Sequence, residues 1–268
     1  MTGTSLTEGR VRSADGTIIA YERSGEGPPI VLVGGAFNDR STTRALAAAL
    51  APNFTVFGYD RRGRGDSGDS GDTAPYAVQR EIEDIAALVG AAGGAAHLYG
   101  LSSGAILAAL ATAAGLPVTG LALFEPPFTV GPHAGSRRPI AGRLAELLAA
   151  DRRADAVECF MVEAVGLPAE QVRGMRQQPM WPGLEALAPT LVHDTTITGD
   201  GGLPADRLAA IDVPTVVVDS TASPQWLRDA TRATAEAVPG ARYVSLEGGF
   251  HEVPPERLAA ELRRGLIG

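Results

Sequence analysis

The sequence has little cysteine, no lysine and few aromatic side chains. Cys159 is the only cysteine among the 268 residues, so no intramolecular disulfide can form, and a reducing compartment, the cytoplasm, is expected. The residues around it, Val157-Glu158-Cys159-Phe160-Met161, follow an apolar helical pattern, which predicts a packed core thiol rather than a nucleophile. All 23 basic residues are arginine, which together with the many alanines, glycines and prolines indicates codon bias more than a functional signal.

The chain also lacks an excess of positive charge and a long uninterrupted apolar run. Its formal net charge of −8 argues against nucleic acid or an anionic membrane surface as the main partner. Residues 1–13 are polar and contain no apolar signal core. No charged residue occurs between Asp84 and Glu125, but Gly115-Leu116-Pro117 divides this stretch, and alanine and glycine dominate it. A buried helix followed by a buried strand is therefore expected rather than a membrane span.

What the chain does contain is a repeated alternation of strand and helix patterns. With 45% apolar and 20% charged residues, it is expected to form one large soluble α/β domain with an insertion. Asp15-Gly16 between two alternating segments predicts a β-hairpin over residues 11–23. Further strands are predicted at 28–33, 55–59, 118–124, 215–218 and 241–246, and helices at 41–50, 75–92, 225–237 and 256–266. This order implies a parallel sheet with right-handed crossovers.

Between residues 128 and 205 the alternation stops. Helical patterns follow one another at 140–150, 154–165 and 169–177, with a less regular one at 183–191, and no strand pattern separates them. We therefore expect a helical insertion over the carboxyl edge of the sheet. The chain divides accordingly into a first part of the core at 1–127, the insertion at 128–205 and a last part of the core at 206–268.

The pattern at the centre of the sequence, residues 97–107, is a short apolar strand, a Gly100-x-Ser102-x-Gly104 turn and an Ala/Leu-rich helix. In this arrangement the chain reverses so sharply at the serine that only small neighbours fit, and the two glycines supply the room. The serine oxygen is then exposed at the carboxyl end of the strand, where the amino terminus of the following helix favours developing negative charge. His97 begins the strand, remote from that end, and is predicted to be structural.

This motif has companions in a characteristic order along the chain: Gly34-Gly35, Asp60-x-x-Gly63-x-Gly65-x-Ser67, and Gly249-Phe250-His251. In their order and spacing, the chain resembles the α/β-hydrolase superfamily over nearly its whole length. The resemblance implies an α/β-hydrolase fold, with a mostly parallel central sheet flanked by helices and with residues 128–205 as a helical cap. Asp60 and Ser67 match family positions, and we expect them to hold the loop after their strand rather than to take part in catalysis.

The resemblance also assigns catalytic roles. Ser102 matches the family's nucleophile, and His251 matches the base that removes its proton. The acid usually follows the strand that is predicted here at 215–218, but that position falls at or near Ser223 and holds no carboxylate. A minority of the superfamily, including haloalkane dehalogenases, has the acid after the strand that follows the nucleophile, where Glu125 stands. We favour Glu125 as the acid; Asp219, at the end of the other strand, and the absence of any acid are the alternatives.

The same resemblance places the oxyanion hole at the backbone N–H groups of Ser103 and Ala36. The family often has histidine where Gly34 stands, but because the donor is backbone, this difference need not abolish the hole. His133 and His193 lie in the inserted segment, within reach of a substrate, and surface positions are expected for both. Seven apolar side chains are candidates for lining a substrate pocket or for ordinary core packing: Phe37, Phe128, Met161, Met175, Met180, Trp181 and Trp226. Of these, Phe37, Phe128, Trp181 and Trp226 are predicted to bind the substrate.

We therefore predict a serine hydrolase that cleaves an ester-like bond of a small, largely apolar substrate. No metal or organic cofactor is predicted, because the four histidines are scattered without ligand spacing. Serine instead of aspartate at position 102 argues against dehalogenase or epoxide hydrolase chemistry. The same residues would also serve carbon–carbon or thioester cleavage, a non-hydrolytic cyclase or lyase, or a small-molecule binding protein on a hydrolase scaffold.

Overall fold

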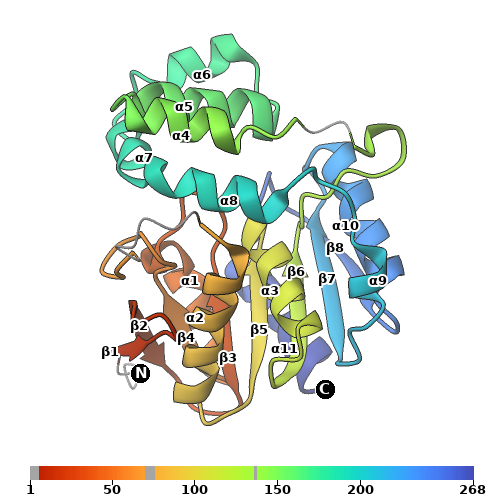
Figure 1. The fold of residues 1–268 in the computed structure, drawn as a ribbon. Helices are drawn as coiled ribbons and strands as arrows, with labels where there is room; N and C mark the ends of the chain where they lie inside the picture. The colour runs from red at the N-terminus through yellow and green to blue at the C-terminus, as the bar shows by residue number, and fades with distance from the viewer. Residues whose placement is uncertain (1–5, 70–75, 136–137) are drawn as a thin grey trace.

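The computed structural model describes residues 6–69, 76–135 and 138–268, and its centre is one eight-stranded sheet (Figure 1). In spatial order the strands are β1 (Thr7–Arg12), β2 (Ile18–Ser24), β4 (Thr55–Tyr59), β3 (Pro29–Val33), β5 (Ala96–Leu101), β6 (Val118–Phe124), β7 (Thr215–Ser220) and β8 (Arg242–Leu246). β2 pairs antiparallel with both β1 and β4, and all other neighbouring strands are parallel. The predicted hairpin and the mostly parallel sheet are both confirmed.

Successive side chains of the central strands enter two different apolar cores. Along β3, Val31 and Val33 belong to one core, whereas Ile30 and Leu32 belong to the other, and all four are fully buried. Because both faces of the sheet are covered by helices, such a strand has a continuous apolar sequence instead of an alternating one.

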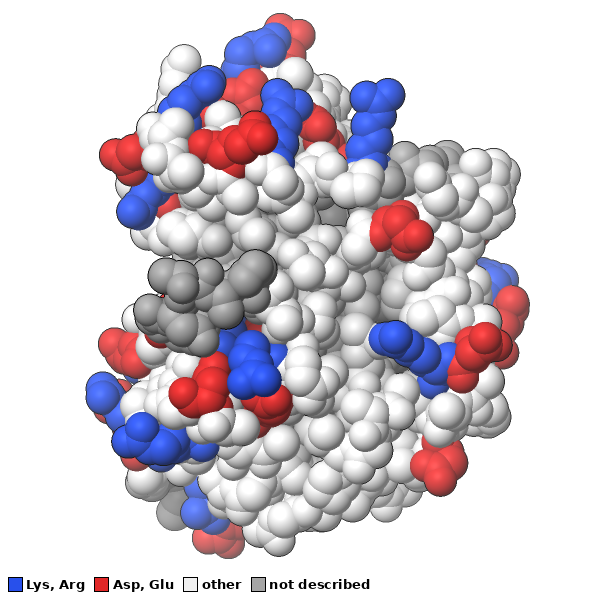
Figure 2. All heavy atoms as spheres, in the orientation of Figure 1, with Lys and Arg blue, Asp and Glu red and all other residues white. Residues whose placement is uncertain are grey.

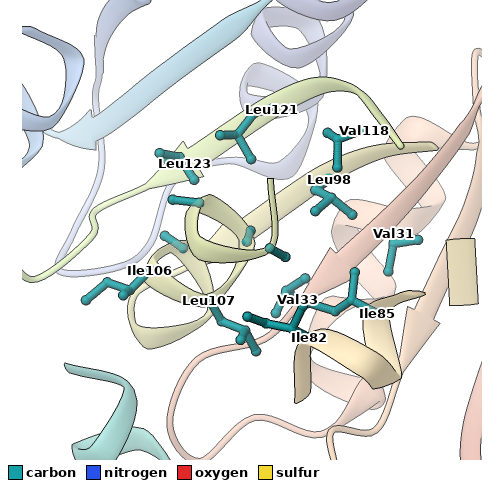
Figure 3. Close-up of a cluster of buried hydrophobic side chains, with 14 of the residues drawn as sticks. Val31, Val33, Ile82, Ile85, Leu98, Ile106, Leu107, Val118, Leu121 and Leu123 are labelled. Carbon is teal, nitrogen blue, oxygen red and sulfur yellow. The ribbon is translucent and has the colours of Figure 1, made fainter. Parts of the chain in front are cut away.

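The helices that cover the two faces are α1 (Arg44–Leu50), α2 (Val78–Ala91), α3 (Ser103–Ala113), α9 (Ala205–Leu208), α10 (Gln225–Ala237) and α11 (Pro255–Leu266). Figure 3 shows the first core, where Ile85 of α2 and Ile106 and Leu107 of α3 meet side chains of β3, β5 and β6. α9 and α10 contribute to the same core. Leu50 of α1 and Leu262 of α11 pack in the core on the opposite face. α2 begins at Val78, and the first residue predicted for this helix, Pro75, lies outside the described residues.

A separate group of helices, which we call the helical layer, lies across one end of the sheet (top of Figure 1). Its members are α4 (Ala141–Ala149), α5 (Arg153–Cys159), the π-helical turn Phe160–Val165, α6 (Ala169–Met175), α7 (Trp181–Leu187) and α8 (Leu191–Thr198). All of them fall within the segment 128–205. They share an apolar core of their own, which includes Leu144, Val157, Cys159 and Leu191.

The helix α8 differs from its sequence prediction. The pattern indicated one irregular helix at 183–191, but α7 ends at Leu187, and after a 3₁₀ turn the chain continues as α8 to Thr198. The polar residues His193, Asp194 and Thr195 are buried along with the apolar ones, so the sequence of α8 shows no distinct apolar face. The expectation of a surface histidine is wrong for His193, whose ring stacks on Tyr76 with 4.1 Å between ring centroids.

Charged side chains are unevenly distributed on the face seen in Figure 2. They gather over the helical layer and toward the margins, whereas the middle of this face is largely uncharged. This middle region contains α3, which belongs to the charge-free stretch between Asp84 and Glu125. Among the described residues, no helix is both long enough and apolar enough to cross a membrane.

Candidate active site

Ser102 occupies a sharp turn between β5 and α3. Its backbone angles are φ +55° and ψ −122°, a strained conformation for a residue other than glycine. The turn is held from both sides, because the Ser102 N–H donates to the carbonyl of Phe124 on β6 at 2.9 Å and the Ser102 carbonyl accepts from the Ala105 N–H at 2.9 Å. Ser102 therefore sits at the carboxyl edge of the sheet, at the amino terminus of α3.

The two glycines of the motif are required by close backbone contacts. A Cβ atom on Gly104 would lie 2.4 Å from the carbonyl oxygen of Val33, and one on Gly100 would lie 2.4 Å from the carbonyl oxygen of Gly104. Real Cβ atoms do not approach oxygen so closely, so any larger residue would push α3 away from β3 and β5. The spacing of the motif thus reflects the packing of the helix against the sheet.

His251 and Glu125 form a directly bonded pair at the same edge. Glu125 Oε2 accepts hydrogen bonds from His251 Nδ1 at 2.7 Å and from the His251 backbone N–H at 3.0 Å. Glu125 Oε1 accepts from the Ser220 N–H at the end of β7 at 2.8 Å. The carboxylate is fully buried, which raises its pKa, but the hydrogen bond from the His251 ring, the Ser223 hydroxyl, the charge of the imidazole and the Ser220 N–H bring the pKa below its ordinary value.

Asp219, the alternative acid, has different partners. Its Oδ2 accepts from the Tyr243 hydroxyl at 2.5 Å and from Arg228 Nε at 3.3 Å, on the side of β7 and β8. Ser223, near which the usual acid position falls, is buried and follows the end of β7. The carboxylate bonded to the histidine ring is thus the one that follows β6.

Backbone strain is concentrated at this edge of the sheet. Among the described residues, five non-glycine residues have a positive φ: Phe37, Ser102, Glu125, Asp151 and His251. Three of them are the nucleophile, acid and base candidates, and Phe37 follows Ala36 directly. Left-handed backbone at such residues is costly and persists where the surrounding structure enforces it, typically at functional sites.

Ala36 and Ser103, the predicted oxyanion-hole residues, line the same small cavity as Ser102 and His251. The loop that carries Ala36 passes close to Ser102, since a Cβ atom on Gly35 would lie 3.1 Å from Ser102 Cβ. The Gly35 N–H donates to Asn38 Oδ1 at 2.9 Å, which fixes the loop. A pair of backbone N–H groups beside a nucleophile at a helix amino terminus is suited to bind a developing oxyanion.

The cavity has a volume of about 50 Å³, and its walls are mainly apolar. The helical layer supplies Phe160, Ala164 and Val165 from the π-helical turn, a type of distortion that frequently occurs at functional sites. The core supplies Pro127, Trp226 and Phe250. The remaining lining residues are two polar side chains of α8, Asp194 and Thr198.

The four predicted substrate-binding residues lie in different places. Trp226 lines the cavity. Phe37 lies behind the cavity wall, because its ring packs edge-to-face against the wall residue Phe160, with 5.4 Å between ring centroids. Phe128 is buried in the core between the sheet and α3, and Trp181 is buried in the core of the helical layer.

The feature that sequence reasoning missed is a buried cluster of charges beside the cavity. Asp194 of α8 lies between Arg61 and Arg64, and Arg61 also pairs with Glu81 of α2. All four side chains have exposed fractions of 1% or less. The only signal in the sequence was the arginine-rich segment after β4, because the other members come from distant positions. No group of three or more His, Cys, Asp or Glu side chains in the described part of the chain is arranged to hold a metal ion.

Comparisons with known proteins agree with this architecture. The profile of the alpha/beta hydrolase family matches residues 30–262. An alpha/beta hydrolase from Sphaerobacter thermophilus is 53% identical, with a TM-score of 0.87 over 96% of this chain and 99% of that one. Two further solved structures share the fold. The enol-lactonase from Burkholderia xenovorans is 22% identical, with a TM-score of 0.71 over 97% of this chain and 100% of that one. A thermophilic esterase from Thermogutta terrifontis is 23% identical, with a TM-score of 0.72 over 96% of this chain and 97% of that one. No curated protein matches significantly. The profile match and the 53% identical structure show that the chain belongs to the α/β-hydrolase family.

Proposed function

We propose that this protein is a serine hydrolase that cleaves an ester-like bond, in a carboxylic ester, lactone or thioester, through an acyl-enzyme. The observation that carries the proposal is the 2.7 Å hydrogen bond between His251 and buried Glu125, in the same site as the strained Ser102. Two of the structures with this fold are named as an esterase and an enol-lactonase, which is compatible with this bond type.

Each group has a defined task in the reaction. Glu125 accepts a hydrogen bond from the Nδ1–H group of His251, which keeps that proton on Nδ1 and leaves the lone pair of Nε2 to take the hydroxyl proton of Ser102. The serine oxygen attacks the carbonyl carbon, and the backbone N–H groups of Ala36 and Ser103 bind the resulting oxyanion. His251 then protonates the leaving group. In the second half, His251 takes a proton from water, and the resulting hydroxide attacks the acyl carbon. The bond from this carbon to the Ser102 oxygen then breaks, and His251 returns the proton to Ser102.

The cavity supports a small, largely apolar acyl group as the substrate part that enters it. Its volume of about 50 Å³ is a few times the roughly 10–15 Å³ that one water molecule needs, and about a third of a cavity that holds benzene. Phe160 and Val165 form its wall on the side of the helical layer. We therefore expect acetyl and propionyl esters to be cleaved faster than octanoyl or benzoyl esters.

The direct test uses intact-mass spectrometry after treatment with a fluorophosphonate, on the wild type and on Ser102→Ala. One adduct on the wild type that is absent from the variant is the expected result. A series of p-nitrophenyl esters from acetyl to octanoyl, a lactone and a thioester then defines the bond and the acyl length. Folded wild-type protein that forms no adduct and cleaves none of these compounds would contradict the proposal and favour a non-hydrolytic enzyme or a binding protein.

A further inference from the structure

Asp194 of α8 connects the helical layer to the residues around the nucleophile. Its Oδ1 accepts from Arg61 Nη1 and from Ser103 Oγ, both at 2.7 Å, and its Oδ2 accepts from Arg64 Nη2 at 2.7 Å. Burial would raise the pKa of Asp194, but the two guanidinium groups and the Ser103 hydroxyl lower it to about 2. The carboxylate is therefore charged at neutral pH, and all of its hydrogen bonds are charge-assisted.

The two arginines that bind Asp194 also bind the loop that contains Ala36. Arg64 Nη1 donates to the carbonyl of Gly35 at 2.5 Å and to that of Asn38 at 3.0 Å, and Arg61 Nη1 donates to the carbonyl of Gly34 at 3.2 Å. The Gly35 carbonyl and the Ala36 N–H belong to one planar trans peptide group, in which the two point in opposite directions. By holding that carbonyl, Arg64 fixes the direction in which the Ala36 N–H points.

Asp194 also holds the second oxyanion donor. Ser103 is the first residue of α3, and its side chain is bonded to Asp194 while its backbone N–H belongs to the free amino terminus of the helix. One carboxylate thus restrains both residues whose N–H groups would bind the oxyanion in the proposed reaction, directly at Ser103 and through Arg64 at Ala36. Such preorganised donors stabilise a transition state because they need no reorientation when charge develops.

We propose that Asp194 is a positioning residue for the oxyanion hole, through which the helical layer orients the two N–H donors. The inference rests on the proposed hydrolase function. Replacing Asp194 by asparagine keeps the shape but removes the charge between two buried arginines, so the Gly35–Ala36 peptide loses its fixed orientation. Ground-state binding of the substrate needs no such orientation, whereas stabilisation of the oxyanion does.

The test compares Asp194→Asn with Asp84→Asn, a matched control that breaks another fully buried pair. Asp84 of α2 binds Arg62 through two hydrogen bonds of 2.8 Å and does not line the cavity. Three quantities are measured at a temperature well below unfolding: kcat and KM on p-nitrophenyl acetate, and the Ki of a trifluoromethyl ketone whose bound hemiketal places an oxyanion in the hole. The loss of one whole oxyanion donor typically costs about 10²–10³-fold in kcat, so a misaligned pair is expected to cost about 10–100-fold.

The expected result for Asp194→Asn is a lower kcat, a Ki that rises by the same factor, and a KM within about threefold of wild type. Asp84→Asn should be destabilised yet keep wild-type values of all three. A kcat and Ki like those of wild type in folded Asp194→Asn, or a loss of kcat without a change in Ki, would overturn the inference. If Asp194→Asn does not fold, the same three quantities are measured on Ser103→Ala, which removes the hydrogen bond to Asp194 and keeps the backbone N–H. An inactive wild type that forms no Ser102 adduct would refute the hydrolase function itself.

Discussion

The acid assignment leads to a quantitative expectation for Glu125→Gln. Three N–H groups point at this carboxylate, one from Ser220 at Oε1 and two from His251 at Oε2. Glutamine has one oxygen and one NH₂ group, so it can accept hydrogen bonds either from Ser220 or from His251, but not from both. With the oxygen toward His251, two of the three hydrogen bonds survive, so this orientation is preferred and the ring keeps its proton on Nδ1.

What the substitution removes is therefore mainly the negative charge beside the imidazolium that forms in the proposed reaction. Two unit charges about 4 Å apart attract each other by about 4 kcal/mol at an effective dielectric constant near 20. Since each 1.36 kcal/mol or so corresponds to tenfold in rate, we expect kcat/KM for Glu125→Gln to fall by about 10³-fold.

The assay is steady-state hydrolysis of p-nitrophenyl acetate, with Asp219→Asn as the matched control. Asp219 is an equally buried carboxylate at the end of the neighbouring strand, but it binds Tyr243 and Arg228 instead of the histidine. Its substitution should change kcat/KM by less than about threefold, because no charge beside the imidazole is lost. Glu125→Gln with more than a tenth of wild-type activity, or Asp219→Asn with a loss as large, would refute the assignment.

Further expectations concern stability and reactivity. Because the pKa of Asp194 is lowered from 3.8 to about 2, its charge stabilises the fold fully above about pH 4, and this contribution is lost as the pH falls toward 2. The free energies of unfolding of wild type and Asp194→Asn, measured with urea, should therefore differ by about 2 kcal/mol less at pH 2 than at pH 6. Gly104→Ala should lower the free energy of unfolding by about 1–3 kcal/mol or more, because its Cβ would meet the Val33 carbonyl. In the same thermal unfolding experiment, Gly142→Ala, in an open part of α4, should leave the stability unchanged or raise it. Burial raises the pKa of Cys159 to about 11, so its thiol should react slowly with a disulfide reagent at pH 8 until the protein is unfolded; fast reaction of the native protein would contradict its packing.

The central strands and the sharp turn at Ser102 were predictable because their signals are local. A strand covered on both faces has a continuous apolar sequence, and the predicted limits of β4 and β6 match the structure residue for residue. The Gly100-x-Ser102-x-Gly104 spacing encodes the approach of one helix to two strands, so the motif also predicts the local geometry.

The rest depends on contacts between residues that are far apart in the chain. α8 has no apolar periodicity, because His193 and Asp194 are buried against Tyr76, Arg61 and Arg64, more than a hundred positions earlier. No spacing within the sequence encodes such a cluster. Aromatic residues posed a similar difficulty: large apolar side chains satisfy a core and a binding cavity equally well, and the sequence does not say which of the two surrounds a given ring.

The position of the helical layer within the chain has a consequence for protein engineering. The chain leaves the sheet at the end of β6, directly before Glu125, and returns to it in β7, whose last residue, Ser220, donates its N–H to that carboxylate. Both junctions of a graft that exchanges residues 128–205 would therefore leave Glu125 and its hydrogen bond to Ser220 intact. The same graft would remove Asp194, the carboxylate that both buried arginines bind, so Arg64 would lose its ion-pair partner and Arg61 would keep only Glu81. A working chimera has to bring an acidic residue to this point of the incoming segment, or replace the two arginines of the core in the same step.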